Sequence, residues 1–209
     1  MLTHALIRRL FTAGVAAMLC LGSAQAVVSN ASPEDFIRSL GDEVINILVD
    51  KSLDQGSRET KFHGMLVEYV DTDTVSRTVL GRYWNQANDE QRKEFQDLYR
   101  EYLIRIYASR FSKFSGEKFN VKNSRTESDR DALVISSIEP PSGTGPVYGV
   151  NWRVRKTDGG YRVVDVMAEG VSLLVTHNQE FSSVIQNNGG RVQGLLEALR
   201  KRIETAKAR

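Results

Sequence analysis

The chain has 209 residues, of which 41% are hydrophobic, and it carries 28 lysines and arginines against 26 aspartates and glutamates. Charges this evenly balanced provide no strongly basic surface, which argues against a nucleic-acid-binding protein and against a polybasic membrane anchor. There is one cysteine, Cys20, and there are three histidines, so we expect neither a disulfide framework nor a metal site.

The first 26 residues have the three parts of a secretory signal peptide. The pair Arg8–Arg9 gives a positive start, residues 10–21 form an apolar run, and Ala24–Gln25–Ala26 supplies a small-residue cleavage site. We therefore expect cleavage after this site, which also removes the cysteine, and a periplasmic mature domain of residues 27–209. No later run reaches the roughly 20 apolar residues of a membrane span.

Helix signals begin the mature chain. Ser32 is a hydroxyl cap, Pro33 suits a first turn, and apolar residues recur at helical spacing from 36 to 48. A polar break over 54–60 separates this helix from a second apolar helix over 62–70. A third stretch then leads to Trp84.

The longest helix is predicted over 90–114. Asn88 is placed as its cap, and Gln91, three residues later, can close a capping box. Aromatic side chains are concentrated between Tyr83 and Phe119. This helical region should therefore form a wall of the core.

After Gly116 the apolar period changes from helical to alternating. Asp158–Gly159–Gly160 predicts a tight hairpin, and the last helix carries apolar positions over 195–203. Four strands are predicted, over 118–123, 132–138, 147–156 and 161–168. In the third strand one face carries Tyr148, Val150, Trp152 and Val154, and the other carries Asn151, Arg153 and Arg155. Helices followed by an antiparallel sheet with one covered face indicate a single α+β domain.

Asp71 and Asp73 directly follow an apolar run, which is how haloacid-dehalogenase-type phosphatases begin their active site. Such an enzyme also needs a downstream Ser/Thr and Lys, a later acidic pair and a parallel sheet. The strands here alternate as in an antiparallel sheet. We therefore interpret these aspartates as the cap of the helix that runs to Trp84.

A second candidate, Gly170–Val171–Ser172, begins like the nucleophile elbow of a hydrolase. Leu174 stands where the closing glycine would be, and the nearby His177 is expected to be an ordinary surface side chain. The residues themselves indicate no catalytic constellation. The apolar and aromatic positions fit either a filled core or a cavity between helices and sheet.

Several short segments have a recognisable order and spacing across residues 32–203. They are Val79–Leu80–Gly81–Arg82–Tyr83–Trp84, Glu90–Gln91, Phe95, Ile106–Tyr107–Ala108, residues 161–166, Glu169–Gly170–Val171–Ser172–Leu173, Phe181 and Gly189–Gly190. Together they resemble the MlaC family of periplasmic phospholipid carriers and its toluene-tolerance relatives. Membership would imply N-terminal helices packed on a curved antiparallel sheet of about four strands, with an apolar cavity between them.

The resemblance implies a shuttle and not an enzyme. Carriers of this family bury the acyl chains of a phospholipid, leave its headgroup in water and carry out no covalent chemistry. They exchange lipid with an inner-membrane ABC transporter bearing MCE-domain subunits and with an outer-membrane lipoprotein–porin complex, which maintains outer-membrane lipid asymmetry. We accordingly expect a monomer with these partners, with phospholipid as cargo, and with no cofactor and no nucleic acid.

Apolar spacing and this resemblance together predict a lining from three places: the helix after the aspartates, the long helix, and the sheet with the segment after it. The predicted lipid-binding residues are Val75, Val79, Leu80, Tyr83, Tyr102, Leu103, Ile106, Tyr107, Val150, Trp152, Val154, Val164, Val166, Val171 and Leu173. Two alternatives remain. One is an isomerase or dehydratase that uses Asp165 and Tyr107 in the cavity; the other is a periplasmic adaptor or chaperone with a filled core.

Overall fold

The computed structural model describes residues 28–111 and 114–207, so the predicted signal peptide and Cys20 lie outside the described residues. The helices are α1 (Pro33–Val49), α2 (Gln55–Tyr69), α3 (Thr72–Leu80), the 3₁₀ helix η1 (Gly81–Asn85), α4 (Asp89–Phe111), α5 (Leu173–Asn187) and α6 (Val192–Lys207). The strands are β1 (Lys118–Thr126), β2 (Asp131–Glu139), β3 (Tyr148–Thr157), β4 (Gly160–Ala168) and β5 (Val171–Ser172). The predicted α+β class is confirmed.

The sheet is an antiparallel meander in which each strand pairs with the next along the chain. The four predicted strands are present, and the two-residue β5 adds a fifth that the alternating pattern is too short to reveal. Trp152 lies opposite Val134 on one side and Val166 on the other, so the predicted apolar face of β3 continues across its neighbours.

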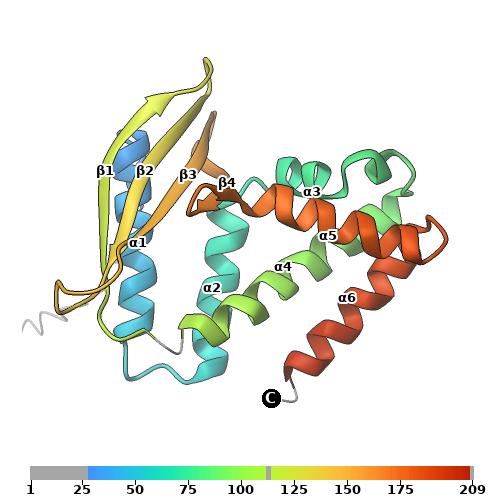
Figure 1. Ribbon diagram of the computed structural model, residues 1–209, viewed down its shortest axis with the longest axis horizontal. Helices are drawn as coiled ribbons and strands as arrows, with labels where there is room; N and C mark the ends of the chain where they lie inside the picture. Colours follow the sequence, from blue (N-terminus) through green and yellow to red (C-terminus); the bar gives the residue numbers. More distant parts are fainter. Residues whose placement is uncertain (1–27, 112–113, 208–209) are drawn as a thin grey trace, which may run out of the picture.

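Figure 1 shows the sheet at one end of the molecule and the helices α3 to α6 at the other, with α2 between them. Helix α1 lies against β1 and β2, whereas α3 and α5 approach the sheet at β4. An isolated parallel bridge from Val70 to Val163 extends this contact along the edge of β4. The α2–α3 junction is therefore the seam between the sheet and the helical part.

Local capping signals in the sequence are confirmed one by one. The backbone N–H of Asp35 donates to the Ser32 hydroxyl at 3.0 Å, and Asn88 and Gln91 exchange the two hydrogen bonds of a capping box. Asp71 is the N-cap of α3 and accepts from the backbone N–H of Thr74 at 3.0 Å. The aspartates thus begin a helix, as the sequence indicates.

The predicted polar break over 54–60 is wrong, because α2 already begins at Gln55. Asp54 caps it and accepts from the backbone N–H of Ser57 at 2.7 Å. The first turns of α2 are polar since they face solvent, and Phe62 is the one residue of this helix that is buried. A search for apolar periodicity therefore missed its start.

The predicted third helix is divided at Gly81, where φ is +53°. The side-chain amide of Asn178 in α5 donates to the carbonyls of Thr78 and Val79 at 3.2 and 3.0 Å. A Cβ on Gly81 would lie 2.7 Å from that amide nitrogen. Glycine is needed here for its backbone angle and for the close approach of α5 to the end of α3.

Candidate functional site

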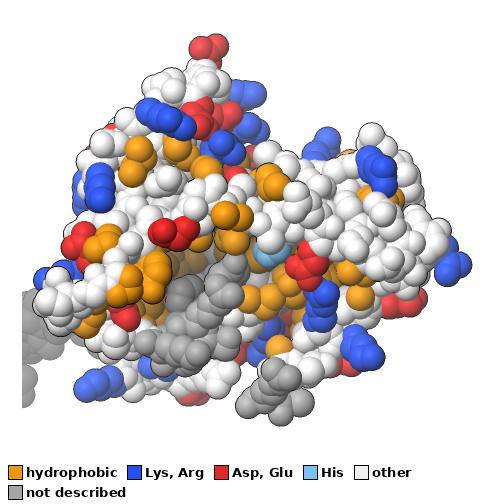
Figure 2. Space-filling view, in the orientation of Figure 1, with side chains coloured by type: hydrophobic (Ala, Val, Ile, Leu, Met, Phe, Trp, Pro, Cys, Tyr) orange, Lys and Arg blue, Asp and Glu red, His pale blue; other side chains and the backbone are white. Residues whose placement is uncertain are grey.

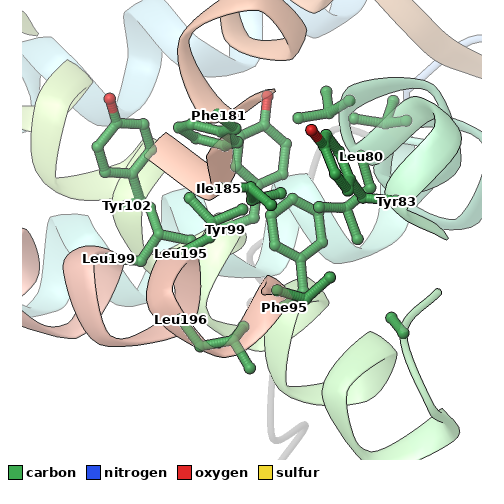
Figure 3. Close-up of a cluster of buried hydrophobic side chains, with 14 of the residues drawn as sticks. Leu80, Tyr83, Phe95, Tyr99, Tyr102, Phe181, Ile185, Leu195, Leu196 and Leu199 are labelled. Atoms are coloured by element: carbon green, nitrogen blue, oxygen red, sulfur yellow. The ribbon is translucent and has the colours of Figure 1, made fainter. Parts of the chain in front are cut away.

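Two apolar clusters fill the two ends of the molecule. The helical cluster, shown in Figure 3, joins side chains of α3, η1, α4, α5 and α6 around Phe95, Tyr99 and Phe181. The sheet cluster joins Phe36, Ile37 and other α1 side chains to one face of β2, β3 and β4. Val70 is partly buried against both clusters, so the seam lies where they meet.

The predicted lipid-binding residues divide between these clusters and their margins. Val75, Val79, Leu80, Tyr83 and Tyr102 belong to the helical cluster, with Leu103 and Ile106 packed against it. Val154 belongs to the sheet cluster, with Trp152 and Val166 packed against it. Val164 is buried, Val150 and Leu173 are half-buried, Val171 is 60% exposed, and the side chain of Tyr107 lies outside the described part of the chain. The structure thus brings together two groups, one on each side of the seam.

The apolar face of the sheet presents hydrocarbon side chains, and the polar atoms among them already have hydrogen-bond partners within the protein. The indole N–H of Trp152 donates to the Ser136 hydroxyl at 3.0 Å, and that hydroxyl donates in turn to the carbonyl of Val150. Val150, Trp152 and Val166 are each only half-buried by the protein. A ligand that lay against them could bury further apolar area without displacing a hydrogen bond.

A pocket lies between α4, α5 and α6 and contains two of the predicted residues. We call it the α4–α6 pocket, and its volume is about 340 Å³, near the lower end of the range for small-ligand sites. Its lining is Tyr102, Arg105, Ile106, Glu180, Arg202, Ile203 and Ala206. The lining thus combines apolar or aromatic side chains with one charged residue from each of the three helices.

Figure 2 shows hydrophobic side chains near the place where the sheet meets the helices. Several large apolar side chains are exposed to solvent, among them Tyr148 at 53%, Val171 at 60% and Val175 at 54%. They come from the start of β3, from β5 and from the start of α5. Exposed apolar groups on adjacent elements are typical of a surface that takes a ligand or partner.

His177 is not the surface side chain that the sequence suggested. It is 7% exposed, and its Nδ1 lies 2.6 Å from the hydroxyl of Tyr99, which is 78 positions away in the chain. Its ring stacks on Phe181 with centroids 5.7 Å apart. The residues next to His177 in the sequence are polar, so the sequence did not reveal that His177 lies on the buried face of α5. No local feature of the sequence identifies Tyr99 as its partner.

Burial lowers the pKa of His177 below its ordinary value of 6.5, and the nearby carboxylate of Glu180 only partly opposes this effect. The unfolded chain therefore takes up a proton first as pH falls, so the free energy of unfolding should decrease as pH drops below about 6.5. His177→Gln should be less stable at neutral pH but should lose less further stability on acidification. Urea unfolding at neutral and mildly acidic pH measures both. Equal acid sensitivity in the two proteins would contradict this prediction.

Asp165, the acid of the enzymatic alternative, is used by the fold. Its side chain is 2% exposed and accepts from the hydroxyl of Ser172 at 2.7 Å and from the backbone N–H groups of Val166 and Leu174 at 2.8 and 3.3 Å. Arg153 approaches it at 3.4 Å. The carboxylate thus fastens the start of α5 to the end of β4.

Within residues 28–111 and 114–207, no three His, Cys, Asp or Glu side chains gather in a way that could hold a metal ion. No helix of that part of the chain combines the length and hydropathy needed to cross a membrane.

Comparison with known proteins gives a consistent result. A family model described as MlaC protein matches residues 38–201. The fold is similar to that of a phospholipid-binding protein from Ralstonia solanacearum solved in complex with a phospholipid, with a TM-score of 0.71 and 27% sequence identity. That match covers 82% of this chain and 96% of the other.

Two relatives carry names that describe transport or tolerance. The toluene tolerance protein ttg2D of Pseudomonas putida is 20% identical over 185 residues, which cover 86% of this chain and 85% of that protein. The intermembrane phospholipid transport system binding protein MlaC of Haemophilus influenzae is 25% identical over 126 residues, or 59% of each chain.

Proposed function

Because the chain belongs to the MlaC family, we propose that it is a periplasmic carrier that binds phospholipid and moves it between the two membranes. The observation that carries the proposal is the similar fold of the Ralstonia solanacearum protein, which was solved with a phospholipid bound and is matched over 96% of its length. The names of the relatives agree with lipid binding and transport.

The physical need for a carrier is large. Burying one methylene group is worth about 0.8 kcal/mol, so two acyl chains of roughly 30 methylenes cost on the order of 20 kcal/mol to expose to water. A protein that replaces water by apolar contacts removes most of this barrier and needs no reactive group. A receiving complex must then provide equal burial, because a carrier with high affinity alone would retain its cargo.

We place the acyl chains at the seam between the two clusters. One side of this site is the half-buried sheet face of Val150, Trp152 and Val166, and the other is the second half of α4 with Leu103 and Ile106. The fully buried residues Val79 and Leu80 support this site from within the helical cluster. The α4–α6 pocket alone is at the small end of the ligand-site range, so a two-chain lipid also requires the sheet side.

The partners follow from the same proposal. The donor and acceptor would be an outer-membrane lipoprotein–porin complex and an inner-membrane ABC transporter with MCE-domain subunits. The carrier would act as a monomer in the periplasm, where cleavage of residues 1–26 would release it. The exposed apolar side chains at the start of β3, in β5 and at the start of α5 support a transfer that does not pass through water.

Mass spectrometry of the protein purified from periplasm without detergent tests the proposal. We expect about one phospholipid per chain in the native spectrum and the same lipid after solvent extraction. Protein that carries no lipid, and that also fails to take lipid from vesicles, would overturn the proposal. That outcome would favour the adaptor with a filled core.

A further inference from the structure

The mouth of the α4–α6 pocket carries an ion pair that the apolar site does not need. Arg202 of α6 donates to the carboxylate of Glu180 in α5, and their side chains are 40% and 38% exposed. The guanidinium carbon of Arg202 also lies 6.0 Å from the centre of the Tyr102 ring. Figure 3 shows Tyr102 at the margin of the helical cluster, beside Leu199.

Resting on the proposed function, we propose that Arg202 binds the phosphate group of the carried phospholipid, with Glu180 as the partner that the phosphate displaces. The planar guanidinium can hold two phosphate oxygens at once, and such charge-assisted pairs are stronger than neutral hydrogen bonds. The ring of Tyr102 lies within the distance at which an aromatic face attracts a cation. Apolar Ile106, Ile203 and Ala206 line the same pocket as this charged pair.

A phosphate can replace Glu180 as the partner of Arg202 with little loss of stability, because the Arg202–Glu180 pair is partly exposed to solvent. Ion pairs at the surface contribute little to stability, so a phosphate that contacts Arg202 through two oxygens can replace Glu180. The released carboxylate remains accessible to water. Glu180 thus holds Arg202 in position before the lipid arrives and competes with the lipid after it arrives.

The other arginine of the pocket is already committed elsewhere. Arg105 donates to Glu59 of α2 at 2.8 Å and to Glu101 of its own helix at 2.9 Å. Its side chain is 21% exposed, against 40% for Arg202. Of the two arginines of the pocket, Arg202 is therefore the one that pairs with an acid, Glu180, which also lines the pocket.

A matched control lies two residues away on α6. Arg200 forms an ion pair with Glu94, and its side chain is 44% exposed, but neither member of that pair lines the pocket. Arg200→Gln removes the same charge from the same helix with the same kind of partner. It separates the effect of local binding from that of net charge and from the loss of an ion pair.

Uptake from vesicles tests the proposal with two lipids of equal chains, phosphatidylglycerol and the uncharged diacylglycerol that lacks the phosphate. We expect Arg202→Gln to weaken uptake of phosphatidylglycerol about tenfold, as for the loss of a charged hydrogen bond, and to leave diacylglycerol uptake unchanged. Arg202→Lys should recover part of the lost phosphatidylglycerol uptake, since lysine keeps the positive charge but cannot hold two phosphate oxygens at once as a planar guanidinium does. Glu180→Gln should strengthen phosphatidylglycerol uptake, and Arg200→Gln should behave as wild type.

Phosphatidylglycerol uptake by Arg202→Gln equal to that of wild type would overturn this inference and leave the proposed function intact. Equal weakening by Glu180→Gln and Arg202→Gln would also overturn it, because the pair would then only hold α5 to α6. A wild-type protein that takes up neither lipid would remove the proposed function together with this inference.

Discussion

Val166→Glu is expected to abolish the phospholipid that co-purifies with the protein. Val166 lies opposite Trp152 on the half-buried apolar face of the sheet, where the proposed acyl chains would cover it. An unpaired carboxylate beneath hydrocarbon loses its hydration, which costs several kcal/mol, so affinity for lipid should fall by at least about a hundredfold. Native mass spectrometry of the purified variant gives the lipid content directly.

The neighbouring residue supplies the control for this prediction. Met167 is also half-buried, but successive residues of a strand point to opposite faces, and Met167 pairs with Asn151 on the polar side of the sheet. Met167→Glu should keep its lipid, and urea unfolding should show that both variants are folded. A normal lipid content in folded Val166→Glu would refute the placement of the acyl chains on this face.

Asp165→Ala is expected to cost about 3–5 kcal/mol of unfolding free energy, the range for breaking a buried, hydrogen-bonded charge pair. The hydroxyl of Ser172 and the backbone N–H of Leu174 would lose their acceptor at the start of α5, and Arg153 would lose a nearby anion. Chemical denaturation of the two proteins measures this difference.

Glu127→Ala is the comparison for Asp165→Ala. Glu127 also pairs with Arg153, at 2.6 Å, but its side chain is 23% exposed, so its loss should cost no more than about 1 kcal/mol. If Asp165 were a catalytic acid with little structural role, its removal would leave stability nearly unchanged. A loss as small as that of Glu127→Ala would therefore contradict the role assigned here.

The polar side chains that hold the fold together are different from the apolar side chains that are proposed to contact lipid. Asp165, Ser172 and Asn178 use their polar atoms to fasten α5 to β4 and to α3. On the sheet face of Trp152 and Val166, the indole N–H does not need a hydrogen-bond acceptor from a ligand, because it already donates to Ser136. The proposed site would therefore select its cargo by apolar area, with charge only at the proposed Arg202 contact.

The sequence by itself determined the features whose causes lie within a few residues. The caps at Ser32 and Asn88 and the tight turn before Gly160 are local hydrogen bonds or backbone angles, and each is present in the structure. The alternation in β3 fixed which side chains share a face, because the period of a strand is two. The order of these elements then sufficed for the α+β class.

The tertiary structure alone decided what covers each apolar face. Periodicity identifies the apolar side of α5 but not its neighbour, so the burial of His177 against Tyr99, 78 positions away, had no signal in either segment. The division of the predicted lining between two clusters is likewise a matter of packing between distant elements. Hydrophobic burial is non-directional, and a sequence therefore shows how much apolar surface must be covered without showing by what.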